Sequence, residues 1–266
     1  MNRGIDDMIN LAKRLFIGVC LLALCPALTR ADEASVDDLV VEGLSLERQL
    51  DPRGALVAFR GAAAVRPDDA FIQQKIAQQL SDAAFIETDI QVRTRLTNEA
   101  LEYAQRAVEL DPKSAVARLS LAVLYGRLSV ESGVRTKIKY ARMIQENAEK
   151  ALVLEPDYAW AWHVLGRWHV EISQLGMTRR AIVNLVFGGL PDASLKEGIR
   201  MLEEAVRLES DAVGHRVELG FAYQLAERFD QAQLCWEEAL AMPSTTIYDP
   251  LAKQRASSAL AAIRAG

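Results

Sequence analysis

Small and apolar residues recur along the chain at spacings of four and three, the period of one face of an α-helix. There are five such sets: Ala55, Phe59 and Ala62; Ala100, Ala104 and Ala107; Ile144, Ala148 and Ala151; Gly198, Leu202 and Ala205; and Ala232, Trp236 and Ala239. A proline stands five residues after each of the first three sets, where it ends a helix or begins the next one. Because side chains this small let a neighbouring helix approach closely, we expect each set to lie in a helix–helix contact.

A second helical pattern alternates with these sets. It has a bulky residue, an aliphatic residue three positions later, a small residue directly after it, and an aromatic or apolar residue three positions further on. Its copies are Gln73, Ile76, Ala77 and Leu80; Arg118, Leu121, Ala122 and Tyr125; Trp162, Leu165, Gly166 and His169; Arg216, Leu219, Gly220 and Tyr223; and a weaker first copy, Leu39, Gly43 and Leu46. Two alternating helices with these signatures are typical of tetratricopeptide repeats. The sequence therefore predicts an all-α, right-handed tetratricopeptide-like helical solenoid, with five helix pairs and their inserts over residues 32–242 and a C-terminal capping helix in residues 243–266.

The length of the repeat is irregular. Pro67, Pro112 and Pro156 follow one another after 45 and 44 residues, Ser210 comes 54 residues later, and only the interval to Ser244 has the standard length of 34. We therefore expect the middle units to carry extra residues between or within their two helices.

The first 31 residues have the parts of a secretory signal peptide. Lys13 and Arg14 give a positive segment, residues 15–24 form an apolar run, and small residues lead up to Ala31. The run is too short to predict a transmembrane helix. We expect cleavage before Asp32 and export, to the periplasm; an uncleaved N-terminal membrane anchor is the alternative.

Net charge limits the class of partner, and the cysteine content limits the redox chemistry. The formal net charge of −5 disfavours a protein that binds nucleic acid by bulk electrostatics, so we expect no nucleic-acid partner. Only Cys235 follows the expected cleavage point, and its helical setting predicts a buried structural thiol.

From Ile138 to Leu190 a Lys-Ile-rich helix, an Ala-rich helix ending in Pro, a His-x-x-Gly-x-Trp helix and an Arg-rich segment ending in Phe-x-x-x-Pro follow one another. Their characteristic residues are Lys139, Ala148, Pro156, His163, Gly166, Trp168, Arg179, Arg180, Phe187 and Pro191. In these motifs and their order the stretch resembles the tetratricopeptide domain of the regulator of microtubule dynamics family. The resemblance implies a non-enzymatic domain, since the family's eukaryotic members are membrane-anchored adaptors associated with microtubules. The short secretory signal differs from the long leading region of the larger members. The resemblance therefore implies an exported bacterial relative, to which microtubule binding should not be carried over.

The sequence carries no catalytic constellation, and we expect a protein that is not an enzyme and has no cofactor. His163 and His169 are six residues apart and so do not share a helical face, and no cysteine stands near them, which disfavours a metal site. His169 occupies the aromatic position of its repeat, where we expect it to pack. His215 falls at an outward position, where we expect it to be solvated.

The first helix of each tetratricopeptide pair lines the concave surface of the solenoid. Its inward positions carry Arg127, Trp160, His163, Arg167, Phe221 and Gln224. Aromatic, arginine and amide groups on one concave surface are typical of a peptide-binding groove. We therefore expect a non-catalytic adaptor that binds protein or peptide partners through this groove, with Arg167 contributing more binding energy than His163.

An apolar insert, residues 177–190, is the second candidate site. We expect it to pack on the solenoid as an extra helix; a lid over a lipid-sized cavity and a partner contact are the alternatives. The basic run of Arg135, Lys137, Lys139 and Arg142 is either a solvated helix face or a contact for an anionic lipid or a phosphate. A lipid-binding module that uses insert 177–190 is thus the alternative to the adaptor.

Overall fold

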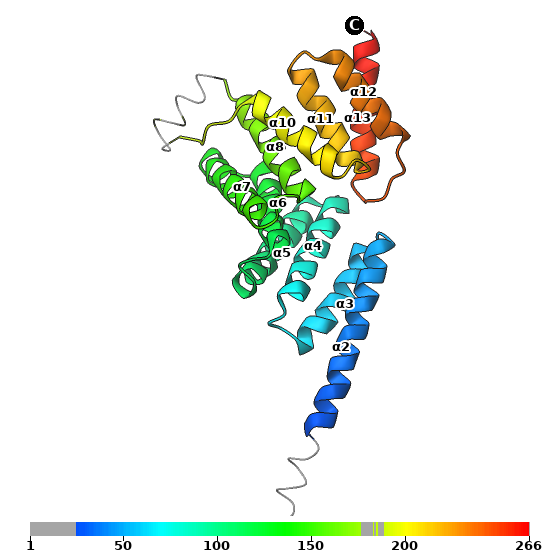
Figure 1. Cartoon of the computed structure of the whole chain (residues 1–266). Coiled ribbons are helices and arrows are strands. Elements are labelled where there is room, and N and C mark those ends of the chain that lie inside the picture. The colour runs from blue at the N-terminus through cyan, green and yellow to red at the C-terminus, as the bar shows by residue number, and fades with distance from the viewer. Residues whose placement is uncertain (1–24, 177–182, 184, 186–188, 266) are drawn as a thin grey trace, which may run out of the picture.

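Eleven helices and no strand make up the part of the chain that the computed structural model describes, which is residues 25–176, 183, 185 and 189–265 (Figure 1). Ten helices form five packed pairs: α2 (Cys25–Arg48) with α3 (Pro52–Val65), α4 (Ala70–Ile86) with α5 (Ile90–Leu110), α6 (Ala115–Val130) with α7 (Val134–Leu154), α8 (Ala159–Ser173) with α10 (Leu195–Leu208), and α11 (Val213–Leu225) with α12 (Phe229–Ala241). The last helix, α13 (Asp249–Ala265), packs against α11 and α12. The predicted all-α solenoid is confirmed.

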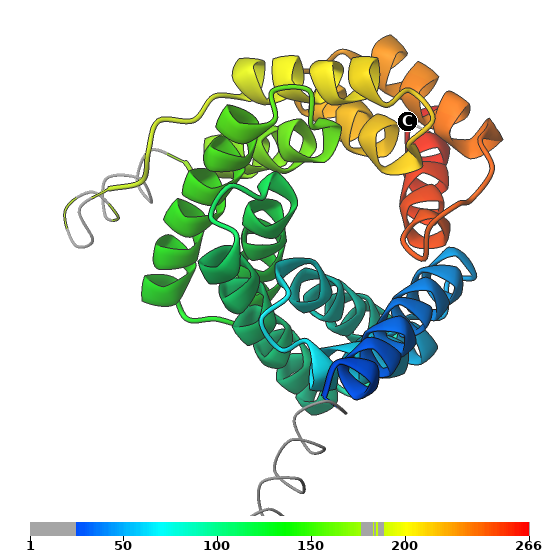
Figure 2. The same cartoon turned by 60° about the horizontal axis from the view of Figure 1, so that its bottom comes forward.

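The pairs follow one another around a common axis in an almost complete turn (Figure 2). Helices α4, α6, α8 and α11 lie on the inside of this turn, and α5, α7, α10 and α12 lie on the outside. The inner helices therefore define a concave face. Because the turn is nearly complete, the connection between α12 and α13 comes close to α4.

Aspartate side chains fix the starts of three successive helices. Asp51 accepts a hydrogen bond from the backbone N–H of Gly54, and Asp69 and Asp89 cap α4 and α5 in the same way. Such caps satisfy backbone donors that have no partner inside the helix.

The small-residue sets lie in the helix contacts, as the sequence predicts. All of their members are buried except Ile144, which is half-buried. At Gly166 of α8 an added Cβ would lie 2.9 Å from Cγ of Leu202 and 3.1 Å from the carbonyl oxygen of Gly198, both in α10. Helices α8 and α10 can approach this closely only because neither glycine carries a side chain.

The irregular repeat length has two structural origins. Helices α5 and α7 have 21 residues each, against 14 in α3 and 13 in α12. The longest interval contains the connection between α8 and α10, of which residues 177–182, 184 and 186–188 fall outside the described residues. None of the described helices is long and apolar enough to span a bilayer.

Candidate partner-binding groove

Four charged side chains form a continuous row across helices α8, α11 and α13. Arg167 donates from Nη2 to Oε1 of Glu171 at 2.8 Å, and its Nε lies 3.4 Å from Oε2 of Glu218. Oε1 of Glu218 in turn accepts from Nη1 of Arg255 at 2.6 Å. We call Glu171, Arg167, Glu218 and Arg255 the charged row.

Both arginines and Glu171 of the charged row remain accessible, whereas the Glu218 side chain is only 14% exposed. The side chains of Arg167 and Arg255 are each 44% exposed. Burial acts to lower the pKa of Arg167, but Glu218 and Glu171 outweigh it and hold that pKa above its usual value. The row therefore offers fixed charges of both signs to a ligand on the concave face.

Phe221 and Gln224 of α11 extend this surface. The guanidinium of Arg255 lies 4.6 Å from the centroid of the Phe221 ring, and Phe221 packs at 5.0 Å on Trp236. Gln224 follows one helical turn later and is half-buried. Phe221 thus stands next to the charged row.

Trp160 and His163 lie in a seam between α8 and α11 instead of lining the groove side by side with Arg167. His163 is only 7% exposed, and its Nδ1 lies 3.0 Å from Nδ1 of His215, which is fully buried. Trp160 packs on both rings, at 5.1 Å and 4.4 Å. The prediction that His215 is solvated is wrong, because Trp160 and His163 of the preceding helix pair pack over it.

Burial controls the charge of this histidine pair. It lowers the pKa of His215 to about 4, against a small opposing effect of Asp211. It also lowers the pKa of His163 well below the usual value, and His215 and Arg167 add to the effect. Two neutral imidazoles can share one N–H between them, whereas two imidazolium ions would repel. The pair is therefore neutral at pH 7.

Arg127 lies away from the charged row, in a second cluster on the concave face. Its Nη2 donates to the hydroxyl of Tyr248 at 2.8 Å, and the same hydroxyl donates to Oδ1 of Asp82. Phe85 completes the cluster, with its ring centroid 4.4 Å from that of Tyr248. We call Asp82, Phe85, Arg127 and Tyr248 the Tyr248 cluster.

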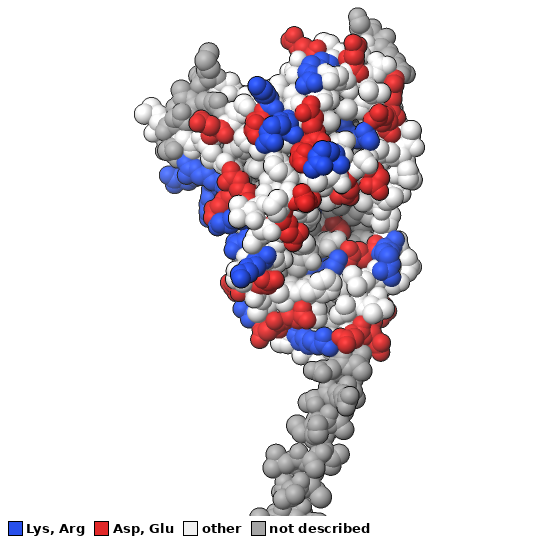
Figure 3. Space-filling view, in the orientation of Figure 1, with Lys and Arg blue, Asp and Glu red and all other residues white. Residues whose placement is uncertain are grey.

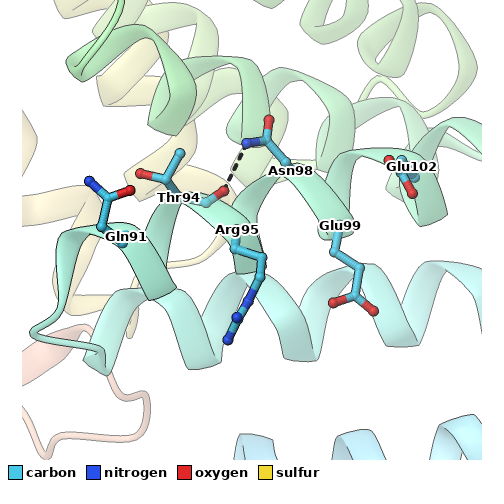
Figure 4. A pocket seen from close by; sticks show the side chains of 6 residues that line it. All are labelled: Gln91, Thr94, Arg95, Asn98, Glu99 and Glu102. Atoms are coloured by element: carbon cyan, nitrogen blue, oxygen red, sulfur yellow. Dashed lines mark hydrogen bonds between the residues drawn. The ribbon is translucent and has the colours of Figure 1, made fainter.

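A shallow hollow of about 550 Å³ lies on the outer helix α5 (Figure 4). It is lined by Gln91, Thr94, Arg95, Asn98, Glu99 and Glu102, all on the same helix. The side chains do not converge on one point. Asn98 donates to the backbone carbonyl of Thr94, and Arg95 and Glu99 point away from Asn98. This hollow does not have the geometry of a binding site.

Two further side chains that could act chemically, an imidazole and a thiol, are packed in the core. His169 is buried with its ring edge-on to Trp168, as expected. Cys235 is buried, and burial raises the pKa of its thiol to about 11. Among the residues the structure describes, no group of three His, Cys, Asp or Glu side chains is placed to hold a metal ion.

The second candidate site is only partly described. Residues 177–182, 184 and 186–188 of the insert lie outside the described residues, so its packing stays a prediction. In the same segment Val183 is buried, whereas Leu185 is 88% exposed. The nearby basic run is solvated along α7, except that Arg142 donates to the carbonyl oxygen of Gly189. Acidic and basic side chains alternate over much of the face in Figure 3.

Four of the residues that shape the concave face are not predicted from the sequence: Asp82, Glu218, Tyr248 and Arg255. Glu218 and Arg255 are ordinary helical surface residues by their spacing, and their pairing depends on how α11 and α13 cross. Tyr248 lies in a connection and is 166 residues from Asp82. No local pattern carries such a contact.

Comparison with known proteins agrees with this architecture. The model of the family described as "Regulator of microtubule dynamics protein 1-3" matches residues 35–264. The chain is 29% identical over 143 residues to regulator of microtubule dynamics protein 1 of Bos taurus, covering 53% of this chain and 45% of that protein. It is 29% identical over 126 residues to regulator of microtubule dynamics protein 3 of Xenopus laevis, covering 47% of this chain and 27% of that protein. The chain thus spans less than half the length of these relatives.

Solved structures share the fold. A thermophilic TPR protein of Thermus thermophilus superposes with a TM-score of 0.62 at 21% identity, over 85% of this chain and 99% of that one. The pilF protein of Pseudomonas aeruginosa superposes with a TM-score of 0.52 at 13% identity, over 87% and 86%. At these identities the likeness concerns the fold alone. With the family match covering nearly the whole solenoid, the chain belongs to the regulator of microtubule dynamics protein 1-3 family and has a tetratricopeptide-like fold.

Proposed function

We propose that this chain is a non-catalytic adaptor that binds a segment of a partner protein on its concave face. One observation carries the proposal: the charged row and Phe221 place exposed arginines, carboxylates and an aromatic ring on three adjacent helices. Arginine and aromatic side chains contribute most to interface energies, and an extended segment can run along such a row. The family name and the fold of its relatives support an interaction role.

A capture experiment tests this proposal. The full chain with a C-terminal affinity tag is used to capture partners from the envelope fraction of its source organism. We expect Arg167→Ala to weaken capture by about 1–3 kcal/mol, because the arginine's planar fork can pair a carboxylate of the partner. The melting temperature should change little, since a half-exposed ion pair contributes at most about 1 kcal/mol to folding.

Arg207→Ala is the matched control. Arg207 lies on the outer helix α10, is exposed, and pairs with Glu204 three residues earlier. Its substitution removes the same charge and the same kind of local ion pair without touching the concave face. Equal losses of capture in both variants would refute binding at the charged row.

We also propose that the protein is exported and cleaved before Asp32. Helix α2 begins at Cys25, so cleavage removes only its first residues, while buried Val36 and the contact of Gly43 with Phe59 lie beyond the cut. N-terminal sequencing of the protein from the periplasmic fraction should give Asp32 first. An intact apolar run would instead indicate an N-terminally anchored protein.

The lipid-binding alternative rests on the insert and the basic run. Native mass spectrometry of the purified chain separates it from the adaptor, because a lipid-binding module would retain a bound lipid.

A further inference from the structure

The Tyr248 cluster surrounds one tyrosine side chain with groups from two inner helices. Asp82 and Phe85 come from α4, Arg127 comes from α6, and Tyr248 comes from the connection between α12 and α13. The guanidinium of Arg127 lies 5.4 Å from the Tyr248 ring centroid and 5.6 Å from that of Phe85. Helices α4 and α6 thus supply an aromatic wall and a cation, and the tyrosine is inserted between them.

The site suits a hydroxylated ring in particular. The hydroxyl accepts from Arg127 and donates to Asp82, so both of its hydrogen-bonding capacities are satisfied by charged groups of opposite sign. Asp82 and Arg127 form no direct ion pair in the described structure; the hydroxyl bridges them. A phenyl ring would fill the same space but would leave both charged groups without this bridge.

The segment that carries Tyr248 has contacts of its own in addition to those in the site. The carboxylate of Asp249 accepts from the backbone N–H groups of Thr245 and Thr246, both at 2.8 Å, and Lys253 donates to the carbonyl oxygen of Met242. Helix α13 then packs on α11 and α12 through buried Ala256 and Leu260. Because these contacts fix the turn and the helix, Tyr248 can leave the site without separating α13 from the solenoid.

The fit of Tyr248 is also incomplete. Nε of Arg127 is buried and has no hydrogen-bond partner among the described residues. Burial raises the pKa of Asp82 to about 6, against the opposing effects of the Tyr248 hydroxyl and Arg127; Glu47 raises this pKa further and Lys75 lowers it. Tyr248 thus leaves one buried donor without a hydrogen bond and one carboxylate in a poorly solvated position. Its binding in the site is therefore not optimal, and another ligand can compete for the site.

From these observations we propose that Asp82, Phe85 and Arg127 form a tyrosine-binding site, which the chain's own Tyr248 fills as an internal ligand and which a tyrosine-bearing segment of a partner protein takes by displacing it. This proposal rests on the proposed adaptor function and gives it a partner chemistry. In the free protein the tethered Tyr248 acts at a high effective concentration, so it blocks weak ligands and lets only a better-fitting segment enter.

A peptide in trans tests the site directly. The probe is a fluorescein-labelled peptide with the sequence of residues 242–250, MPSTTIYDP, added to the full chain and measured by fluorescence anisotropy. We expect it to bind Tyr248→Ala at least tenfold more tightly than the wild type, whose site is filled. The same peptide with Phe in place of Tyr should bind Tyr248→Ala at least tenfold more weakly. Equal binding to both proteins, no binding to either, or no preference for Tyr over Phe would overturn the proposal.

Two further variants locate the binding. In the Tyr248→Ala background, Arg127→Gln should abolish binding, whereas Arg95→Gln, on the outer face of α5, should leave it unchanged. If circular dichroism shows that Tyr248→Ala is unfolded, Tyr248→Phe replaces it, since the ring that packs on Phe85 is kept. That variant should then bind the peptide more tightly than the wild type does, and equal affinities would overturn the proposal.

Size-exclusion chromatography with light scattering tests whether the tyrosine comes from a second copy of this chain. A wild-type dimer that becomes monomeric on Tyr248→Ala would assign the site to a second copy and overturn the partner assignment. The capture experiment at Arg167 remains separate. Failure of the peptide with successful capture refutes the tyrosine site alone, and failure of capture with peptide binding refutes the charged row alone.

Discussion

Substituting Gly166 by alanine tests the close approach of α8 and α10. A Cβ at this position would lie 2.9 Å from Cγ of Leu202, 3.1 Å from the Gly198 carbonyl oxygen and 3.2 Å from the Leu202 backbone nitrogen. Two of these atoms belong to the backbone, and Leu202 is 1% exposed, so none can move aside without shifting α10. Such overpacking costs about 1–3 kcal/mol.

Gly126→Ala is the matched control. Gly126 lies inside α6, and its added Cβ would meet only Cδ1 of Ile144 at 3.9 Å, an ordinary contact. Replacing a helix-interior glycine by alanine gains about 1 kcal/mol of helix propensity in both variants. The difference between the two therefore isolates the overpacking.

We expect Gly126→Ala to melt higher than the wild type and Gly166→Ala to melt lower than Gly126→Ala. At roughly 2–4 °C for each kcal/mol, the two variants should differ by about 2–12 °C in a calorimetric or circular dichroism melt. Equal melting temperatures would show that α8 and α10 do not approach as closely as the structure has them.

Three further predictions concern titratable groups. Burial lowers the pKa of His215 to about 4 in the folded protein, against 6.5 in the unfolded chain, so the free energy of unfolding should fall as the pH drops from 6.5 towards 4. The melting temperature should therefore fall less between pH 7.5 and pH 5 in His215→Leu than in the wild type. An equal fall would contradict the buried pair. The pH dependence from Asp82 runs the other way, because its pKa is about 6 in the folded protein and 3.8 in the unfolded chain. As the pH is lowered from 7.5 to 5, the wild type should gain free energy of unfolding relative to Asp82→Asn, measured by urea unfolding. A constant difference would argue against burial of this carboxylate. In the chain that begins at Asp32, where Cys235 is the one cysteine of the sequence, burial raises the pKa of its thiol to about 11. We expect no reaction with a disulfide reagent at pH 8 until guanidinium unfolds this chain, and rapid reaction of the folded protein would show that the thiol is exposed.

The helical framework could be predicted because its signal is local. Small residues at i, i+4 and i+7 mark a helix contact wherever that contact occurs, and the positions around Gly166 and Ala151 are buried as the spacing implies. On α8 the same period separates the exposed Arg167 from the buried Gly166 and Trp168.

The groove was less predictable, because its composition depends on how helices cross. Helical spacing put His215 outside, but Trp160 and His163 of the preceding pair cover it. Arg127 was assigned to the same surface as Arg167, yet its neighbours come from α4 and from a connection near the C-terminus. A contact between residues more than a hundred positions apart leaves no mark in either local sequence.

The bridge from Tyr248 to Asp82 has a consequence for how the chain folds. In a repeat array each unit touches only its neighbours, so stability is nearly a sum of units and adjacent interfaces, and the ends fray independently. A contact spanning 166 residues departs from this nearest-neighbour rule, because it makes opening near α13 depend on the integrity of α4 and α6. Hydrogen exchange of backbone amides in α4 and in the α12–α13 connection should therefore be coupled, so that loss of the tyrosine hydroxyl accelerates exchange at both places together.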